Sequence, residues 1–85
     1  MAYQIKIKKS AEKELEKLPL SAILILRPKI IGLAKNPFSA GYKKLKGFKN
    51  LFRIRIGDYR IIFSINHNEK QIEILKIGDR KNIYE

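Results

Sequence analysis

The most informative stretch of this chain reads Leu51-Phe52-Arg53-Ile54-Arg55-Ile56-Gly57-Asp58-Tyr59-Arg60-Ile61-Ile62-Phe63. Apolar and other residues alternate before the Gly-Asp dipeptide and again after it, and a period of two is typical of a β-strand with one buried face. The dipeptide itself favours a tight hairpin turn. We therefore expect a hairpin whose apolar side chains face a core and whose arginines, Arg53, Arg55 and Arg60, share the opposite face.

The rest of the chain predicts a single α+β domain over residues 1–85. The expected elements are a strand at Tyr3–Lys8, a helix capped by Ser10 and ending near Pro19, a helix from about Leu20 to Lys35, a loop at 36–50, and strands at Leu51–Ile56, Tyr59–Asn66 and Gln71–Ile77. The order β-α-α-β-β-β predicts two N-terminal helices packed on one face of a mostly antiparallel four-stranded sheet.

Two elements carry irregularities. Pro28 inside the second helix removes a backbone N–H, which predicts a kink or the loss of one helical hydrogen bond. In the last strand, Ile72 and Ile74 compete with Leu75 and Ile77 for the core, so its facing stays open. Whichever facing holds, Arg80 follows just past the strand end, where a bend could return it to the arginine face.

The net charge of +11 on 85 residues indicates an anionic partner, because self-repulsion of this size destabilises a compact chain. The excess is concentrated between Gly41 and Arg60, where Asp58 is the single acid. The basic residues of that segment are Lys43, Lys44, Lys46, Lys49, Arg53, Arg55 and Arg60. Nucleic acid is the first candidate, ahead of an acidic protein and a membrane surface.

Other classes of protein are disfavoured by composition. The chain has no cysteine and one histidine, which excludes thiol catalysis, disulfides and a histidine-rich metal site. The longest apolar run, Ala22 to Leu26, is far shorter than the roughly 20 residues of a membrane span. The N-terminus has no apolar segment typical of a signal peptide. We expect a cytoplasmic protein that needs no metal ion or cofactor.

Three stretches carry a family likeness: Lys44-Leu45-Lys46-Gly47, Phe52 to Arg60, and Ile77-Gly78-Asp79-Arg80 through Tyr84. In their order and spacing they resemble the RelE/ParE toxin superfamily, and its RelE branch most of all. The resemblance implies a toxin of a type II toxin–antitoxin system, held inactive in a hetero-oligomer with a cognate RelB-like antitoxin. In the RelE branch the activity is endonucleolytic cleavage of mRNA in the ribosomal A site.

The resemblance also implies a set of catalytic residues. Arg60 matches the arginine after the Gly-x-Tyr turn, Arg80 the arginine near the last strand, and Tyr84 the C-terminal tyrosine. Arg53 and Arg55 fall on strand positions that are lysine in some members. The chain departs from the pattern at the residue before the late arginine, which is Asp79 here and histidine or another basic residue in many members.

The chemistry of the residues agrees with such a reaction. RNA can be cut without metal when its 2′-hydroxyl attacks the adjacent phosphorus, and guanidinium forks stabilise the charge that gathers on the phosphoryl oxygens. Which residue moves the proton stays open: an arginine does not give up its own proton, Tyr84 could act through its phenol or stack on a base, and Lys44 and Lys46 are nearby amines. His67 is expected in a turn.

The remaining expectations concern binding and alternatives. Lys43, Lys44, Lys46 and Lys49 would contact the RNA or ribosomal phosphate backbone without reading sequence. The antitoxin would be acidic or carry an acidic segment, laid along the helices or the basic face. Two other functions remain open: a ParE-like toxin that binds DNA gyrase without cutting RNA, and a degenerate toxin that only binds RNA.

Overall fold

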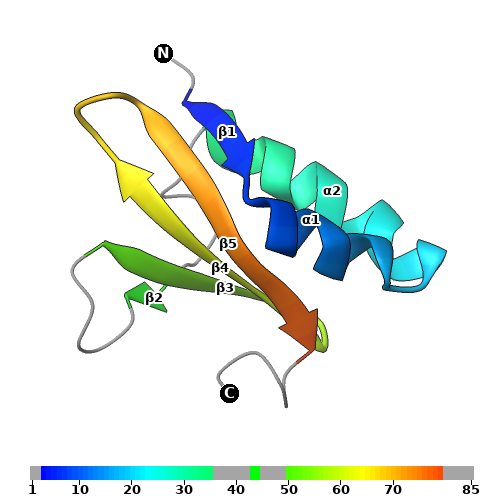
Figure 1. The fold of residues 1–85 in the computed structure, drawn as a ribbon. Coiled ribbons are helices and arrows are strands. Elements are labelled where there is room, and N and C mark those ends of the chain that lie inside the picture. The colour runs from blue at the N-terminus through cyan, green and yellow to red at the C-terminus, as the bar shows by residue number, and fades with distance from the viewer. Residues whose placement is uncertain (1–2, 36–42, 45–49, 80–85) are drawn as a thin grey trace.

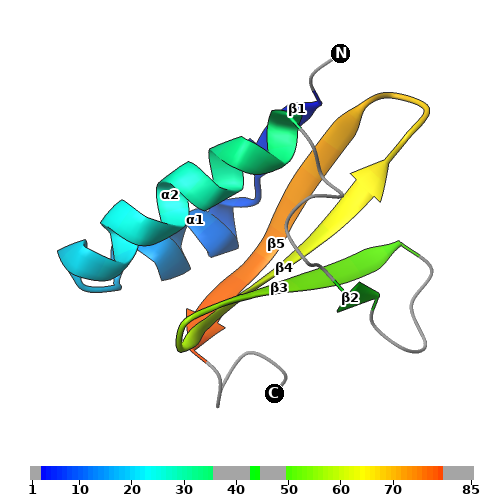
Figure 2. The same ribbon diagram turned by 180° about the vertical axis from the view of Figure 1, so that it is seen from behind.

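The computed structural model describes residues 3–35, 43–44 and 50–79 (Figure 1). In chain order the elements are β1 (Gln4–Ile7), α1 (Lys9–Glu16), α2 (Leu20–Lys35), β2 (Lys43–Lys44), β3 (Leu51–Ile56), β4 (Tyr59–Asn66) and β5 (Gln71–Asp79). The strands form one sheet in the order β1-β5-β4-β3-β2, with β1 parallel to β5 and the other neighbours antiparallel. Both helices lie on the same side of this sheet (Figure 2).

The predicted α+β class and the β-α-α-β-β-β order are confirmed, with one addition. The four expected strands are present, and β2 extends the sheet beyond β3 within the segment that was predicted as a loop. Two adjacent lysines near glycines show no alternation of apolar and polar residues. Only their backbone pairing, Lys43 with Arg53 and Lys44 with Phe52, reveals this strand.

The helices differ from the prediction in detail. Ser10 is not the N-cap of α1: Lys8 occupies that position and makes no side-chain capping hydrogen bond. The helix α2 runs without interruption from Leu20 to Lys35 although Pro28 lies inside it. Pro28 and Leu24, whose carbonyl loses its usual helical partner, are both exposed, so water can replace the missing donor. Of the helices that the structure describes, none is long and apolar enough to cross a membrane.

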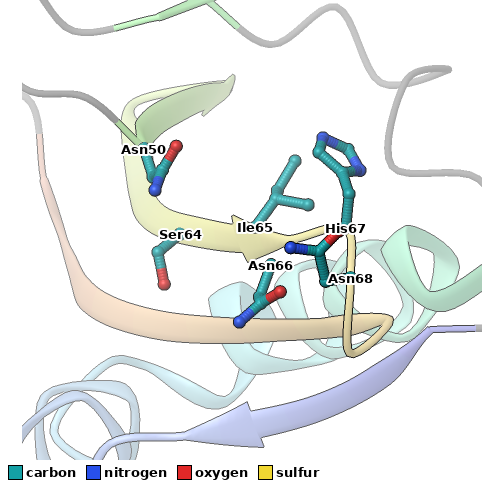
Figure 3. Close-up of a pocket in the computed structure, with 6 residues that line it drawn as sticks. All are labelled: Asn50, Ser64, Ile65, Asn66, His67 and Asn68. Carbon is teal, nitrogen blue, oxygen red and sulfur yellow. The ribbon is translucent and has the colours of Figure 1, made fainter.

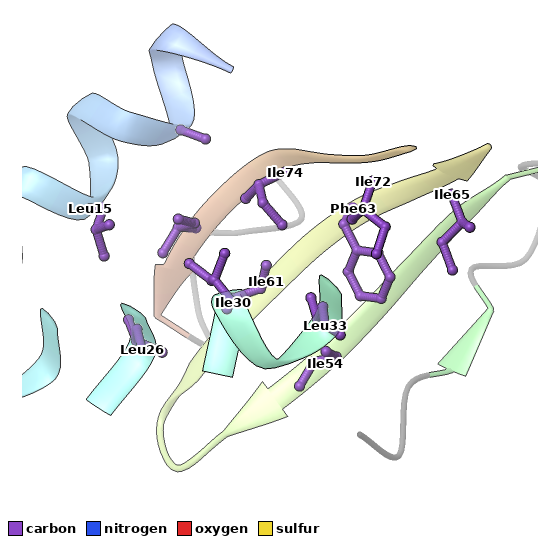
Figure 4. Close-up of a cluster of buried hydrophobic side chains, with 12 residues drawn as sticks. Leu15, Leu26, Ile30, Leu33, Ile54, Ile61, Phe63, Ile65, Ile72 and Ile74 are labelled. Atoms are coloured by element: carbon purple, nitrogen blue, oxygen red, sulfur yellow. The ribbon is translucent and has the colours of Figure 1, made fainter. Parts of the chain in front are cut away.

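The core lies between the helical layer and the sheet (Figure 4). Its members are Ala11, Leu15, Leu26, Ile30, Leu33, Ile54, Ile61, Phe63, Ile65, Ile72, Ile74 and Ile77. Phe63 is completely buried, and its ring stacks on that of Phe52 with centroids 5.9 Å apart. Burying one side chain of this size contributes about 1.5–3 kcal/mol. One face of the sheet therefore carries the main core, and the other face points away from both helices.

A β-bulge resolves the facing of the last strand. Phe63 pairs with Ile74 while the preceding Ile62 pairs with Lys76, so Leu75 is an extra residue in β5. An extra residue reverses the alternation of side chains. The buried residues of β5 accordingly lie on both sides of the bulge, at Ile72, Ile74 and Ile77. Both competing patterns in the sequence thus contribute to the core, one before the bulge and one after it.

Candidate functional site

The β3–β4 hairpin positions the candidate site. Its turn is the Gly57-Asp58 dipeptide, and Gly57 has a φ of 58°, the left-handed value needed at the first central position of a type II′ turn. Beyond the turn, Ile56 pairs with Tyr59 and Arg55 with Arg60. The predicted turn and the register that follows from it are therefore confirmed.

The three predicted arginines lie on the face of the sheet that points away from the helices. Arg55 and Arg60 are directly opposite each other on adjacent strands, a relation that places Cβ atoms about 4.5–5.5 Å apart. Arg53 is two residues along β3 from Arg55 and therefore shares its face. The side chain of Arg55 is exposed, whereas those of Arg53 and Arg60 are half-buried. This face, with Arg53, Arg55 and Arg60, is called the arginine face below.

The two opposed arginines repel each other, and an anion that lies between them would offset this repulsion. Like charges directly across an antiparallel pair destabilise it by about 0.2–1 kcal/mol, and the net charge of +11 adds a general repulsion. When an anion lies between the two arginines, their attraction to it outweighs their mutual repulsion. Each guanidinium group can donate paired hydrogen bonds to the oxygens of the anion. Arg55 and Arg60 therefore suit a phosphate group.

The neighbouring strand β5 adds a cation that the sequence did not reveal. Lys76 is exposed and pairs with Ile62, which puts it on the arginine face. Its facing follows from the bulge at Leu75, so an ordinary alternation could not have placed it. Gly78 pairs with Arg60 and has no side chain to cover the guanidinium from this side; a glycine within a strand often marks such a close approach.

The remaining predicted residues are placed differently. Lys43 is the register partner of Arg53, whereas Lys44 is exposed and pairs with Phe52, whose side chain faces the helices. Asp79 pairs with Tyr59 and so holds a register position of the helix-facing set. The other predicted site residues lie outside the described part of the chain: Lys46, Lys49, Arg80 and Tyr84.

The single histidine lies far from the arginine face. His67 follows the end of β4 in the turn to β5, as predicted, and its Nδ1 is 2.9 Å from the hydroxyl of Tyr3. Seven residues of extended strand separate His67 from Arg60, a distance of about 23 Å. Within residues 3–35, 43–44 and 50–79, no three His, Cys, Asp or Glu side chains gather into a group that could hold a metal ion.

The same arrangement of helices and sheet is found in solved structures of RelE toxins. The archaeal RelE–RelB complex of Pyrococcus horikoshii OT3 contains a chain 34% identical to this one, with a TM-score of 0.83 over 96% of this chain and 99% of that chain. The isolated RelE toxin of E. coli, 22% identical, shares the fold with a TM-score of 0.80 over 98% of this chain and 92% of that one.

Sequence comparison shows the family directly. The model for the ParE toxin of the type II toxin–antitoxin system parDE matches residues 5–84, and the chain belongs to this family within the RelE/ParE superfamily. It is 31% identical over 87 residues to a protein of Methanocaldococcus jannaschii assigned as toxin RelE1, covering 99% of this chain and 97% of that protein. Toxin RelE of Mycobacterium tuberculosis is 28% identical over 83 residues, covering 96% and 86%. The superfamily expected from the sequence is thereby confirmed.

Proposed function

We propose that this toxin cuts mRNA on the ribosome and that its own residues, without a metal ion or cofactor, stabilise the reacting phosphate. The observation that carries this proposal is the opposed pair Arg55 and Arg60, with Arg53 beside it on the same face. Two arginines held against each other suit an anionic group that lies between them. Cleavage of RNA needs such a site, because negative charge develops on one phosphate.

The proposed reaction is an internal transfer of the phosphoryl group. The 2′-oxygen of the ribose forms a bond to the adjacent phosphorus and loses its proton to a base. The bond from phosphorus to the 5′-oxygen of the next nucleotide breaks, and that oxygen takes up a proton. The products are a 2′,3′-cyclic phosphate and a 5′-hydroxyl. Arg55 and Arg60 would donate hydrogen bonds to the phosphoryl oxygens that gain charge as the new bond forms.

Residues near the C-terminus complete the proposed site. Arg80 and Tyr84 match family positions, and β5 ends at Asp79 beside the hairpin, one residue before Arg80. We propose that Arg80 adds a further cation and that Tyr84 contributes its phenol or stacks on a base. The ribosome would hold the mRNA in the reactive geometry, which can supply several kcal/mol of the barrier reduction. Such an activity on the ribosome would require the protein to be in the cytoplasm.

The lysines would bind the strand on either side of the reacting phosphate. Lys43 lies next to Arg53 in the sheet register, and Lys76 lies across β4 from it. Contacts of this kind are sequence-independent and weaken with salt. Lys44, Lys46 and Lys49 are proposed to contact ribosomal or mRNA backbone in the same way. Lys44 would contact the backbone from the face of the sheet that carries the helices, because it pairs with Phe52.

The proposed partner is a RelB-like antitoxin, as in the complexes that several similar structures contain. A chain of charge +11 favours an acidic partner, whose affinity should fall as salt rises. The helix α2 offers it apolar contacts, because Leu20, Leu24 and Ile31 are 68%, 66% and 64% exposed. These three positions fall on one side of the helix at 100° per residue.

The test is a cleavage assay with purified ribosomes carrying a defined mRNA in the A site, read by primer extension. The protein should cut the ribosome-bound mRNA, and Arg60→Ala should lower the rate about 10²–10³-fold, the usual effect of removing one donor to a developing oxyanion. The matched control is Arg27→Ala, which also removes one arginine but from α2, where Arg27 pairs with Glu12 at 3.1 Å. Equal rates for Arg60→Ala and the wild type would contradict the proposed site.

A second candidate follows from the family model itself, whose description names ParE. In this case the toxin would bind DNA gyrase and leave RNA intact. The two functions separate after expression in cells. Cleaved ribosome-bound mRNA supports the first, whereas intact mRNA together with gyrase-dependent DNA breaks supports the second.

A further inference from the structure

A polar pocket lies at the far end of β4 from the arginine pair (Figure 3). It has a volume of about 540 Å³ and is lined by Asn50, Ser64, Ile65, Asn66, His67 and Asn68. Small-molecule pockets in proteins span about 300–1,000 Å³. The pocket opens where β3 has ended, since the register of β3 with β4 stops at the pair Leu51 and Ser64.

Two of the residues that line the pocket, Ser64 and Asn66, lie on the same strand face as the arginines. Side chains alternate along β4, so Ser64 and Asn66 share the face of Arg60. Figure 3 shows Ser64 and Asn66 on one side of the strand, and Ile65 and His67 on the other. Four residues of extended strand separate Arg60 from Ser64, a distance of about 13 Å. A single strand of a few nucleotides could reach both sites.

Two of the residues that line the pocket, Asn66 and His67, are held by local hydrogen bonds. Asn66 accepts a hydrogen bond from the backbone N–H of Glu69 through Oδ1 at 3.1 Å, which shapes the turn. The hydroxyl of Tyr3 holds the ring of His67 through Nδ1 at 2.9 Å. Lys70 lies over the Tyr3 ring, with Nζ 5.3 Å from its centroid. A pocket with pre-set walls loses less conformational entropy when a ligand binds.

The chemistry of the lining selects the occupant. Among the lining residues that the structure describes, none is a lysine, arginine or carboxylate, which suits a neutral group better than a phosphate. Asparagine amides and a serine hydroxyl offer donors and acceptors together, which match the edge of a nucleobase. The hydrogen bond in the turn gives Asn66 a structural role. Asn50 and Ser64 lie outside this turn, so the turn does not explain why these two residues are polar.

We propose that this pocket binds the base of a nucleotide on the RNA strand whose phosphate lies between Arg55 and Arg60. The inference rests on the proposed function, and it deepens that function by adding a base-reading subsite. The arginine face holds the phosphate and carries no sequence information. The pocket, with Asn50 and Asn68 at its rim, distinguishes one base from another by hydrogen bonds to its edge.

The test is an NMR titration of the isotope-labelled protein with uncleavable 2′-O-methyl hexanucleotides. Four carry a single base type (A, C, G or U), and a fifth has the same backbone without bases. Base-bearing strands should shift both the arginine Nε signals of Arg55 and Arg60 and the side-chain amide signals of Asn50 and Asn68. The abasic strand should shift the arginine signals alone.

Each other pattern has a definite meaning. Arginine shifts without amide shifts, or amide shifts that the abasic strand reproduces, would overturn the base subsite and leave the phosphate site standing. Amide shifts without arginine shifts would support the subsite and contradict the phosphate site. If no signal moves with any strand, both are wrong.

A pair of variants measures the selectivity of the pocket. Asn68→Ala removes an exposed amide at the rim and should reduce the affinity ratio between the best and worst hexanucleotide about tenfold. Its affinity for the abasic strand should not change. The control, Gln4→Ala, removes an exposed amide from β1 at the opposite edge of the sheet. If Asn68→Ala, like Gln4→Ala, leaves the affinity ratio unchanged, Asn68 does not read the base.

Discussion

Replacing Arg55 with threonine should make the protein more stable and less active. Arg55 faces Arg60 across the hairpin, and a like-charged pair at such positions costs about 0.2–1 kcal/mol. Arg55 is exposed, so its removal uncovers little apolar surface, and threonine suits a strand. The free energy of unfolding of the variant should therefore rise by about 0.5 kcal/mol, the middle of the range for such a pair. For a domain of this size that corresponds to about 2–4 °C in Tm.

The assay is thermal unfolding followed by circular dichroism, at low salt and at 1 M sodium chloride. At 1 M salt the screening length falls to about 3 Å, so the difference in Tm between the two proteins should become clearly smaller. Added phosphate at constant ionic strength should raise the Tm of the wild type more than that of Arg55→Thr, because binding to the folded state stabilises it. In the ribosome assay the same variant should cut more slowly.

The control separates this local effect from the general effect of net charge. Arg27→Ala also lowers the net charge of +11 by one, but it breaks the ion pair with Glu12. Arg27 is 49% exposed there, and such surface pairs contribute about 0–1 kcal/mol. Its Tm should stay the same or fall. A lower Tm for Arg55→Thr, or a gain in Tm as large at 1 M salt as at low salt, would refute the repulsion between Arg55 and Arg60.

Two further predictions follow from the glycines and from β5. Gly57→Ala should lower the free energy of unfolding by about 1 kcal/mol, because alanine is strained at a φ of 58°. Gly32→Ala within α2 should raise it by about 0.5–1 kcal/mol, because alanine favours a helix. At both positions the added Cβ meets no atom within 4 Å, so no steric clash is expected. Urea unfolding measures both, and changes of the same sign would contradict this account. Lys76→Ala should slow ribosome-dependent cleavage, but less than Arg60→Ala, whereas the exposed Lys13→Ala on α1 should leave the rate unchanged. Equal rates for the two lysine variants would remove Lys76 from the site.

The sequence predicted the hairpin well because every signal in it agrees. Alternation sets which side chains of β3 and β4 face the core, and Gly57 fixes the register by accepting a φ of 58°. A register shifted by one residue would bury Arg53 and Arg55 and expose Phe52. The cost of that exchange, several kcal/mol for the buried charges alone, leaves one arrangement.

The errors lie where the structure depends on contacts beyond the local sequence. Leu75 breaks the alternation of β5, and only pairing with β4 shows that it is an inserted residue and that Lys76 joins the arginine face. The strand β2 exists through two backbone pairs with β3. Ser10 is a good N-cap by type, yet the helix begins before it because β1 delivers the chain at Lys8, whose N–H bonds to the carbonyl of Ile74 at 3.0 Å.

One exception to the alternation in β4 adds to the case for a binding face. Ile62 points away from the helices and lies outside the main core cluster, yet it is only 6% exposed. Its partners across the two neighbouring strands are Arg53 and Lys76, both of which carry long aliphatic stems. Stems of this kind cover apolar surface while the charged ends stay at the rim. Ile62 therefore gives the arginine face an apolar floor. Cations beside buried apolar surface act through a lower local dielectric than cations free in water, which strengthens their attraction to a phosphate.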